Sequence, residues 1–216
     1  MVFRIDLKIF LLLILFYITK QIEFYAIIMF FAIIHELGHL LTGLTLGMKP
    51  KKIELKLFGL SVSFKISIDE YNKKIKKANM LEVKKIIVAL AGPITNLLII
   101  LIANFIHLND YQKNMIIYSN LLLILINMLP IFPLDGGRVL KGLLHIILGK
   151  NKAEKYSNKI SFITLILLTI SASILILYIK NIAIFLIIVV LFAIHIRETQ
   201  IYKNRQKIMQ IIEEQK

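Results

Sequence analysis

Two histidines and a glutamate lie close together in one of the most apolar stretches of the chain, "FFAIIHELGHLL". His35 and His39 are four residues apart, so on a helix both imidazoles project from the same side, with Glu36 beside them. This is the H-E-x-x-H pattern, in which two histidines bind zinc and the glutamate acts as general base. Ionisable groups inside an apolar span are energetically expensive and indicate a functional site. The sequence therefore predicts one Zn²⁺ ion held by these two histidines.

The third zinc ligand has to come from another part of the chain, because a catalytic zinc site usually has three protein ligands and one open position. Most of the candidate carboxylates lie at the ends of apolar segments or in a lysine-rich loop: Glu23, Glu54, Asp69, Glu70, Glu82 and Asp110. Asp135 differs, because it follows an apolar run broken by Pro130 and Pro133. Non-helical backbone at membrane depth is tolerated only where it is buried in protein or lines a water-filled cavity. Asp135 is therefore the strongest candidate.

The elements that must position these residues are membrane-spanning helices. The chain has 216 residues, of which 58% are hydrophobic, and it contains no cysteine, which excludes disulfides and thiolate metal sites. A soluble domain is usually about half apolar, and a spanning helix needs about 20 apolar residues. By these criteria we expect six spans, at about 3–19, 22–46, 86–108, 114–133, 160–179 and 181–196.

The basic residues indicate the topology. The six spans place 24 of the 27 lysines and arginines on one side of the membrane, together with both termini. The positive-inside rule makes that side the cytoplasm. The net charge of +14 is then explained by topology and by attraction to anionic lipid headgroups, so we expect no nucleic-acid partner.

A β-hairpin is expected between the second and third spans. Apolar and polar residues alternate over 52–68, and the alternation changes phase at Gly59. Such a ribbon lies on the bilayer or offers a strand edge to an extended peptide. The expected fold is thus an all-α membrane protein with six transmembrane helices, a broken fourth helix and a membrane-associated β-hairpin. One domain would cover 1–196, followed by a cytoplasmic tail, 197–216, with a short surface helix.

A further polar residue is expected inside the membrane, in "ALAGPITN" near the inner end of the third span. Gly92 and Pro93 favour close helix packing and a kink. Asn96 needs a polar partner at this depth, and either a peptide or the outer shell of a metal ligand would serve.

The motifs "HELGH", "AGPITN" and "NMLPIFPLDGG", in this order, resemble the site-2 protease family of intramembrane zinc metalloproteases. The resemblance covers residues 30–140, and the six-span layout extends it to most of the chain. It implies His35, His39 and Asp135 as zinc ligands and Glu36 as the catalytic acid/base. It also implies Asn127 as a substrate-positioning or oxyanion-stabilising group. We expect Asn96 and Pro133 to join Asn127 in binding substrate.

Within the family, the short first span and "LPIFPLDGGR" are most similar to the stage IV sporulation protein FB branch, which processes the precursor of a sporulation sigma factor at the membrane. The resemblance therefore implies a membrane-associated protein substrate of this kind, inhibitory membrane-protein partners and a multi-pass location in the cell membrane.

A membrane metal-ion or proton transporter is the alternative class, because such proteins also place His, Glu and Asp inside their spans. A transporter of this type usually shows paired repeat halves with the site between them. The second half of the chain contains no counterpart of the His35–His39 pair, which favours the protease.

Overall fold

A computed structural model describes residues 2–5, 17, 22–56, 59–64, 75–179 and 182–214. The chain forms two compact units, unit 1 at residues 1–128 and unit 2 at residues 129–216. The boundary between them falls inside the segment "NMLPIFPLDGG" that the sequence marks as a broken helix.

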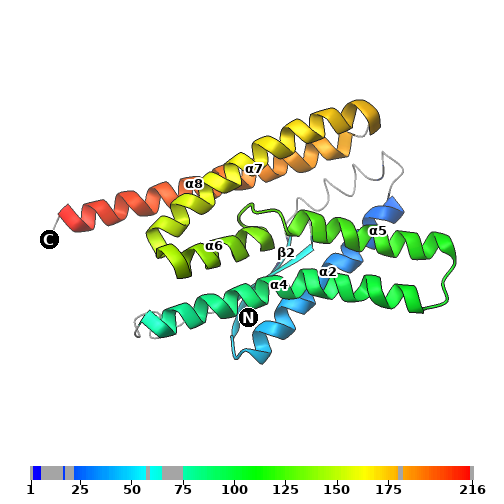
Figure 1. The fold of residues 1–216 in the computed structure, drawn as a ribbon, viewed down its shortest axis with the longest axis horizontal. Coiled ribbons are helices and arrows are strands. Elements are labelled where there is room, and N and C mark those ends of the chain that lie inside the picture. Colours follow the sequence, from blue (N-terminus) through cyan, green and yellow to red (C-terminus); the bar gives the residue numbers. More distant parts are fainter. Residues whose placement is uncertain are drawn as a thin grey trace. The chain divides into compact units, whose positions relative to one another are not determined.

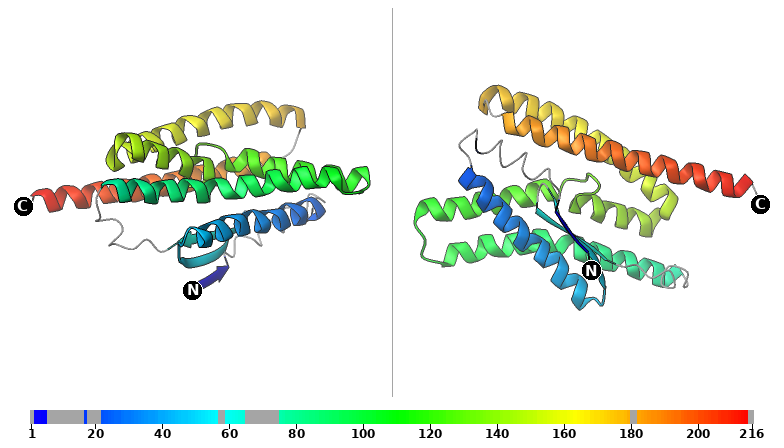
Figure 2. Two further views of the ribbon diagram at one scale, coloured as in Figure 1. Left: turned by 60° about the horizontal axis from the view of Figure 1, so that its bottom comes forward. Right: turned by 180° about the vertical axis from the view of Figure 1, so that it is seen from behind.

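Unit 1 consists of helices and a small sheet: β1 (Val2–Ile5), α2 (Ile22–Thr45), β2 (Pro50–Lys56), β3 (Gly59–Phe64), α4 (Ile75–Phe105) and α5 (Asp110–Asn127). Figures 1 and 2 show α4 and α5 running side by side, with α2 lying obliquely against them. Phe31, Ala32 and Leu123 form an apolar core between α2 and α5. Ile99 of α4 packs against the same core, so all three helices share it.

The crossing of α2 over α4 depends on small residues. A Cβ atom on Gly38 would overlap Thr95 Oγ1 and lie 3.2 Å from the carbonyl oxygen of Ala91. One turn further along α2, a Cβ on Gly43 would overlap the ring of Phe64 from β3. Glycine at these positions lets the helix approach its neighbours closely, as in other membrane helices.

Helix α2 ends in a Schellman motif. Gly47 has φ +75°, its N–H donates to Leu44 O at 3.0 Å, and the N–H of Met48 donates to Gly43 O at 2.9 Å. The ammonium group of Lys84 donates to Leu46 O at 2.8 Å and satisfies one more terminal carbonyl. The helix that carries both histidines is therefore fixed at its end as well as along its length.

The sheet of unit 1 has the strand order β1-β2-β3. β2 and β3 pair antiparallel from Pro50 opposite Phe64 to Lys56 opposite Gly59, which overlaps the predicted hairpin 52–68 but begins two residues before it. β1 pairs parallel with β2, with Val2 opposite Lys52 and Ile5 opposite Leu55. The predicted first span at about 3–19 is therefore wrong at its start, because residues 2–5 extend along the edge of β2. The remainder of that span, apart from the helical Tyr17, lies outside the described residues.

Unit 2 contains α6 (Asp135–Leu148), α7 (Lys150–Ile179) and α8 (Ile182–Glu214). Helices α7 and α8 lie side by side, and α6 packs against α7 (Figures 1 and 2). The core is formed by Ile131, Leu165 and Leu191. Helix α8 does not stop near residue 196, because no glycine or proline interrupts the sequence from there to Glu214. The tail predicted to hold a separate short helix thus continues α8.

The protein is mostly helical, and its long apolar helices are typical of a multi-pass membrane protein. Within the described residues, three helical segments are long and apolar enough to cross a membrane: Tyr25–Thr45, Asn79–Phe105 and Lys150–Ile174. Two helices extend beyond their predicted spans on the N-terminal side, since α4 begins at Ile75 and α7 at Lys150. Lysine-rich turns precede the apolar part of both helices, and nothing in those turns breaks a helix.

Candidate metal centre

The two histidines of the H-E-x-x-H pattern meet on one face of α2. His35 and His39 are 3% and 2% exposed, and their Nε2 atoms lie 3.2 Å apart. The two rings are nearly perpendicular, with an interplanar angle of 87°. The four-residue spacing therefore brings two imidazole nitrogens to one point, as the sequence predicts.

The backbone of α4 orients the imidazole of His39. Its Nδ1 atom lies 2.6 Å from Val88 O and 3.2 Å from the backbone nitrogen of Gly92. These two contacts demand opposite protonation of Nδ1, because a carbonyl can only accept a hydrogen bond and an N–H can only donate one. The carbonyl contact is the shorter, so Nδ1 carries the proton and donates to Val88 O. Nε2 then keeps its lone pair, which is the arrangement that metal-binding histidines use.

Gly92 leaves the space that the two imidazoles occupy. A Cβ atom at this position would overlap His35 Nε2 and His39 Nε2 and lie 2.6 Å from His39 Cε1. The sequence predicts that Gly92 allows close helix packing. In the structure the space beside it is occupied by the imidazole rings of His35 and His39. Any larger residue here would displace the nitrogens that face each other.

The pair fits zinc. Two nitrogen ligands at about 2.0–2.1 Å from a tetrahedral zinc ion lie about 3.3 Å apart. The observed Nε2–Nε2 separation of 3.2 Å agrees with this geometry. The pair supplies two soft-to-borderline nitrogen ligands, which suit zinc better than magnesium or calcium.

The other three residues of unit 1 that the sequence predicts to belong to the site differ in their burial and in their hydrogen bonding. Glu36 is half-buried on α2 between the two histidines, and Asn127 is the half-buried last residue of α5. Asn96 is 0% exposed on α4, one turn beyond Gly92 and on the same helical face. Neither atom of its amide has a hydrogen-bond partner within the described part of the chain. A buried unpaired amide is energetically expensive, and a bound hydrogen-bonding group would relieve this cost.

Two more buried polar residues lie on α5 and belong to none of the predicted sites. Ser119 and Asn120 on α5 are both 0% exposed. The amide nitrogen of Asn120 donates to Ile116 O at 2.8 Å, whereas its oxygen and the Ser119 hydroxyl have no partner among the described residues. The signal that could have revealed them is a Ser-Asn pair inside an otherwise apolar run, "IIYSNLLLILI".

Asp135 belongs to unit 2, where it is the first residue of α6 and 4% exposed. Its Oδ1 atom lies 3.6 Å from Arg138 Nη1, one turn further along the helix. A carboxylate at the first turn also interacts favourably with the positive end of the helix dipole. Pro133, two residues earlier, is half-buried in the segment that leads into the helix.

The segment that precedes Asp135 is non-helical, as predicted, and packs directly on α6. Gly137 makes this possible, because a Cβ atom there would overlap the backbone of Ile131 and Phe132. Two turns are closed by backbone hydrogen bonds, from Ile131 N to Leu129 O at 2.7 Å and from Leu134 N to Ile131 O at 2.8 Å. The prediction of unusual backbone at "LPIFPLDGG" is therefore met within unit 2.

Comparisons with known proteins point in one direction. Residues 110–170 match the sequence profile of Peptidase family M50. Stage IV sporulation protein FB of Bacillus subtilis is 26% identical over 155 residues, which are 70% of this chain and 50% of that protein. A Synechocystis sp. protein, whose name assigns it provisionally to the zinc metalloproteases, is 30% identical over 144 residues, 62% of this chain and 35% of its own length. The chain thus spans half or less of each of these relatives.

A solved structure shares the fold. The site-2 protease from Methanocaldococcus jannaschii superposes with a TM-score of 0.65 and 21% identity, over 90% of this chain and 88% of that one. At this level of identity the match is evidence about the fold and not about the reaction.

Proposed function

Because the chain belongs to the site-2 protease family, we propose that it is an intramembrane zinc metalloprotease, which hydrolyses a peptide bond of a membrane-associated protein. One observation carries the proposal. The Nε2 atoms of His35 and His39 lie 3.2 Å apart on a helix long and apolar enough to cross a membrane. Their buried position beside Glu36 joins a metal-binding pair to a general base in a single turn.

Asp135 is proposed as the third zinc ligand. It is buried, it carries a carboxylate at the start of a helix, and it follows a fixed non-helical segment. Two histidines and one carboxylate form a typical ligand set for a hydrolytic zinc site, which leaves one position for water. Bound zinc supplies Lewis acidity, so that water becomes a nucleophile near neutral pH.

Glu36 is proposed as the proton carrier. Its carboxylate takes a proton from the attacking water and returns it to the leaving amine of the cleaved peptide bond. His35 lies ten residues before Thr45, the last residue of α2, which is about 15 Å along the helix. Water therefore has to reach Glu36 through a polar path from the cytoplasmic side.

Asn127, Asn96 and Pro133 are proposed to bind substrate. An amide side chain can donate a hydrogen bond to the oxyanion that forms during hydrolysis, which is the role proposed for Asn127. Asn96 offers a buried amide without a partner among the described residues. Pro133 has no N–H, so it restricts the path of the backbone next to Asp135.

The hairpin is proposed to hold the substrate in an extended form, because a peptide bond in a helix is not accessible to hydrolysis. An extended segment can add to the edge of a sheet through backbone hydrogen bonds. β3 is an edge strand of the β1-β2-β3 sheet, and its Phe64 packs against Gly43 of the histidine-bearing helix. Proline substitutions along β3 should slow cleavage; unchanged rates would refute this role.

The topology is proposed to have six spans in the cell membrane, with both termini and the active-site opening on the cytoplasmic side. The distribution of lysine and arginine supports this orientation. The resemblance of the motifs to the sporulation branch of the family implies a sigma-factor precursor as substrate and membrane proteins as inhibitory partners, and the similarity to stage IV sporulation protein FB supports that branch.

The test uses the purified full chain and its Glu36→Gln variant, with the exposed Glu23→Gln variant as control. We expect about one zinc per chain in all three proteins. A tagged sigma-factor precursor in detergent should be cleaved by the wild type and the control, and about 10²–10⁴-fold more slowly by Glu36→Gln. Zinc uptake into sealed vesicles without any cleavage would instead identify a transporter.

A further inference from the structure

We propose that Lys141, Glu154 and Ser161 are positioning residues, which hold the non-helical segment 128–134 so that Asp135 is presented in a fixed orientation. This inference rests on the proposed function, because it concerns the presentation of a zinc ligand. The three side chains come from α6 and α7, and none of them belongs to the motifs that the family resemblance rests on.

Ser161 on α7 binds the segment by two hydrogen bonds. Its hydroxyl accepts from the N–H of Phe132 at 3.1 Å and donates to the carbonyl oxygen of Pro130 at 3.2 Å. The residue is 0% exposed. One hydroxyl thus satisfies two backbone groups that a non-helical segment leaves without partners, which matters because buried backbone groups need a hydrogen-bond partner.

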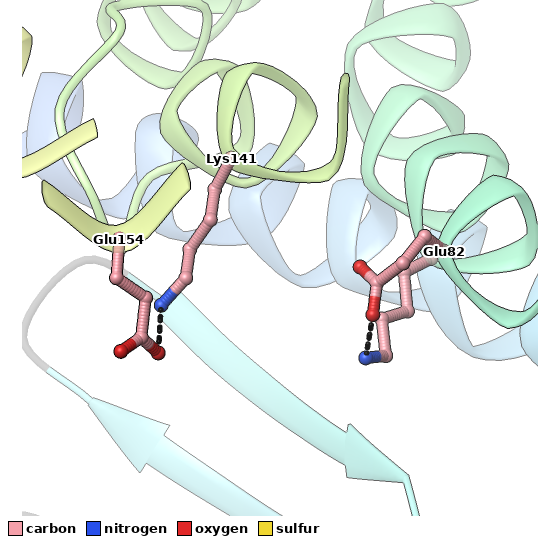
Figure 3. A network of polar contacts seen from close by, with 4 residues as sticks. Glu82, Lys141 and Glu154 are labelled. Atoms are coloured by element: carbon pink, nitrogen blue, oxygen red, sulfur yellow. Dashed lines mark hydrogen bonds and ion pairs between the residues drawn. The ribbon is translucent and has the colours of Figure 1, made fainter. Parts of the chain in front are cut away.

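Lys141 on α6 fixes the side chain of Phe132. Its ammonium group lies 4.6 Å from the centre of the Phe132 ring, within the range of a cation–π interaction. The same ammonium group donates to Glu154 Oε1 on α7 at 3.2 Å. Figure 3 shows this ion pair between the two helices. Lys141 therefore connects α6 and α7 to the aromatic ring three residues before Asp135.

The contacts of α7 with the segment lie on one helical face. Glu154, Ser161 and Leu165 are spaced by seven and four residues, so their side chains project in similar directions. Leu165 packs against Ile131, which is itself 0% exposed. One face of α7 thus contacts the segment directly through a hydroxyl and an apolar side chain, and it reaches Phe132 indirectly through the ion pair of Glu154 with Lys141.

The ion pair is not placed to stabilise the fold as a whole. The Lys141 side chain is 32% exposed, and ion pairs accessible to solvent contribute little to stability. A cavity of about 80 Å³ adjoins the pair, lined by Phe132, Lys141, Glu154, Asn158, Glu198, Ile201 and Tyr202. Removal of the lysine charge should therefore leave the fold intact while it releases the Phe132 ring.

The chain contains a matched control for each contact. Lys85 pairs with Glu82 at 2.6 Å with closely similar exposure, 32% and 9%, but within the single helix α4, where Figure 3 shows Glu82. Ser157 on α7 is 1% exposed, and its hydroxyl has no hydrogen-bond partner among the described residues. Lys85→Met and Ser157→Ala thus remove the same groups from equally buried sites whose side chains make no hydrogen bond or ion pair with the segment among the described residues.

The experiment measures zinc affinity of the full chain in detergent by competition with a fluorescent chelator. Lys141→Met and Ser161→Ala should each weaken zinc binding about tenfold, which is the lower end of the effect of removing outer-shell contacts. Lys85→Met and Ser157→Ala should stay within about twofold of the wild type. Lys141→Arg should restore affinity, since it keeps the charge over the ring. Affinities for Lys141→Met and Ser161→Ala equal to those of the controls would overturn the proposal.

A second readout does not depend on metal. Hydrogen–deuterium exchange of the peptide that covers 128–135 should accelerate in Ser161→Ala, because the Phe132 N–H loses its acceptor. Unchanged exchange in this peptide would overturn the role of Ser161 even if zinc binding fell. A wild-type chain that binds no zinc would overturn the proposed function and this inference together. Zinc bound equally by the wild type and all variants would overturn this inference alone.

Discussion

The histidines of unit 1 and the aspartate of unit 2 are held by different physical means. His35 and His39 lie on one continuous helix, which approaches α4 closely at Gly38 and whose two imidazoles fill the space left by Gly92. Asp135 begins a helix after a non-helical segment, which is fixed by the side chains of Ser161 and Lys141. Close packing positions the two histidines, whereas the hydrogen bonds of Ser161 and the cation–π contact of Lys141 fix the segment before Asp135.

The difference predicts which substitutions each region tolerates. Packing of helix backbones responds to added volume, since protein interiors have few voids. A non-helical segment responds to the loss of a partner for its N–H and C=O groups, which a helix satisfies by itself. Added methyl groups should therefore affect both units wherever a glycine lies against neighbouring atoms, whereas unit 2 should also be sensitive to deleted hydroxyl and ammonium groups.

Gly137→Ala should have the largest effect, because it adds volume where unit 2 packs backbone on backbone. The new Cβ would overlap backbone atoms of Ile131 and Phe132, which cannot move as a side chain can. We expect a loss of about 3 kcal/mol or more in the free energy of unfolding, the upper end for overpacking, together with weaker zinc binding. Denaturant titration in detergent would measure it. Leu143→Ala, at an exposed position of the same helix, is the control, and equal stabilities of the two variants would contradict the expectation.

Gly92→Ala should separate zinc binding from stability in unit 1. The new methyl group would overlap the Nε2 atoms of both histidines, whereas alanine is the better helix former by about 1 kcal/mol. We expect zinc affinity to fall about 10–100-fold with little change in unfolding, measured by chelator competition and by denaturation. Gly43→Ala is the control on the histidine-bearing helix, because its methyl group would meet Phe64 and not the imidazoles. It should show the reverse pattern, and zinc affinity lowered equally in both variants would refute the distinction.

Gly38→Ala tests the helix crossing itself. Its Cβ would overlap Thr95 Oγ1, so we expect a loss of about 1–3 kcal/mol in unfolding free energy. Combining it with Thr95→Ala removes the overlapping atom and should recover part of the loss, which a double-mutant cycle would measure. Strict additivity of the two substitutions would show that these residues do not meet in the membrane-embedded protein.

The sequence allowed the local features of the site to be predicted. The four-residue spacing of His35 and His39 anticipates that their imidazoles meet, since helix geometry alone determines it. Proline and glycine around Asp135 likewise anticipate a broken helix, because both act on the backbone where they stand.

Features that depend on partners distant in the sequence could not be predicted. The strand at residues 2–5 exists only because β2 offers an edge about fifty residues later. Ser161 and Lys141 belong to ordinary helical patterns, and their contacts with Phe132 arise from tertiary packing. Gly92 was interpreted as a packing residue, since no spacing rule relates it to histidines more than fifty residues earlier.

Backbone conformation alone, without any steric overlap, should determine the effect at the two glycines with positive φ, one in each unit, where a Cβ would meet nothing within 4 Å. Gly47 ends α2 in a Schellman motif, in the left-handed helical region that asparagine also adopts. Gly149 has φ 80° and ψ 166°, a combination available to glycine almost alone.

Gly47→Ala should therefore lower the free energy of unfolding by about 1 kcal/mol and Gly149→Ala by about 1–3 kcal/mol, as measured by denaturant titration. Asparagine should restore stability relative to alanine at residue 47 but not at residue 149, because only the first backbone lies in the region that asparagine favours. Restoration at both positions would mean that the turn between α6 and α7 relaxes into the left-handed helical region, and unit 2 would then be the more adaptable of the two at its helix ends.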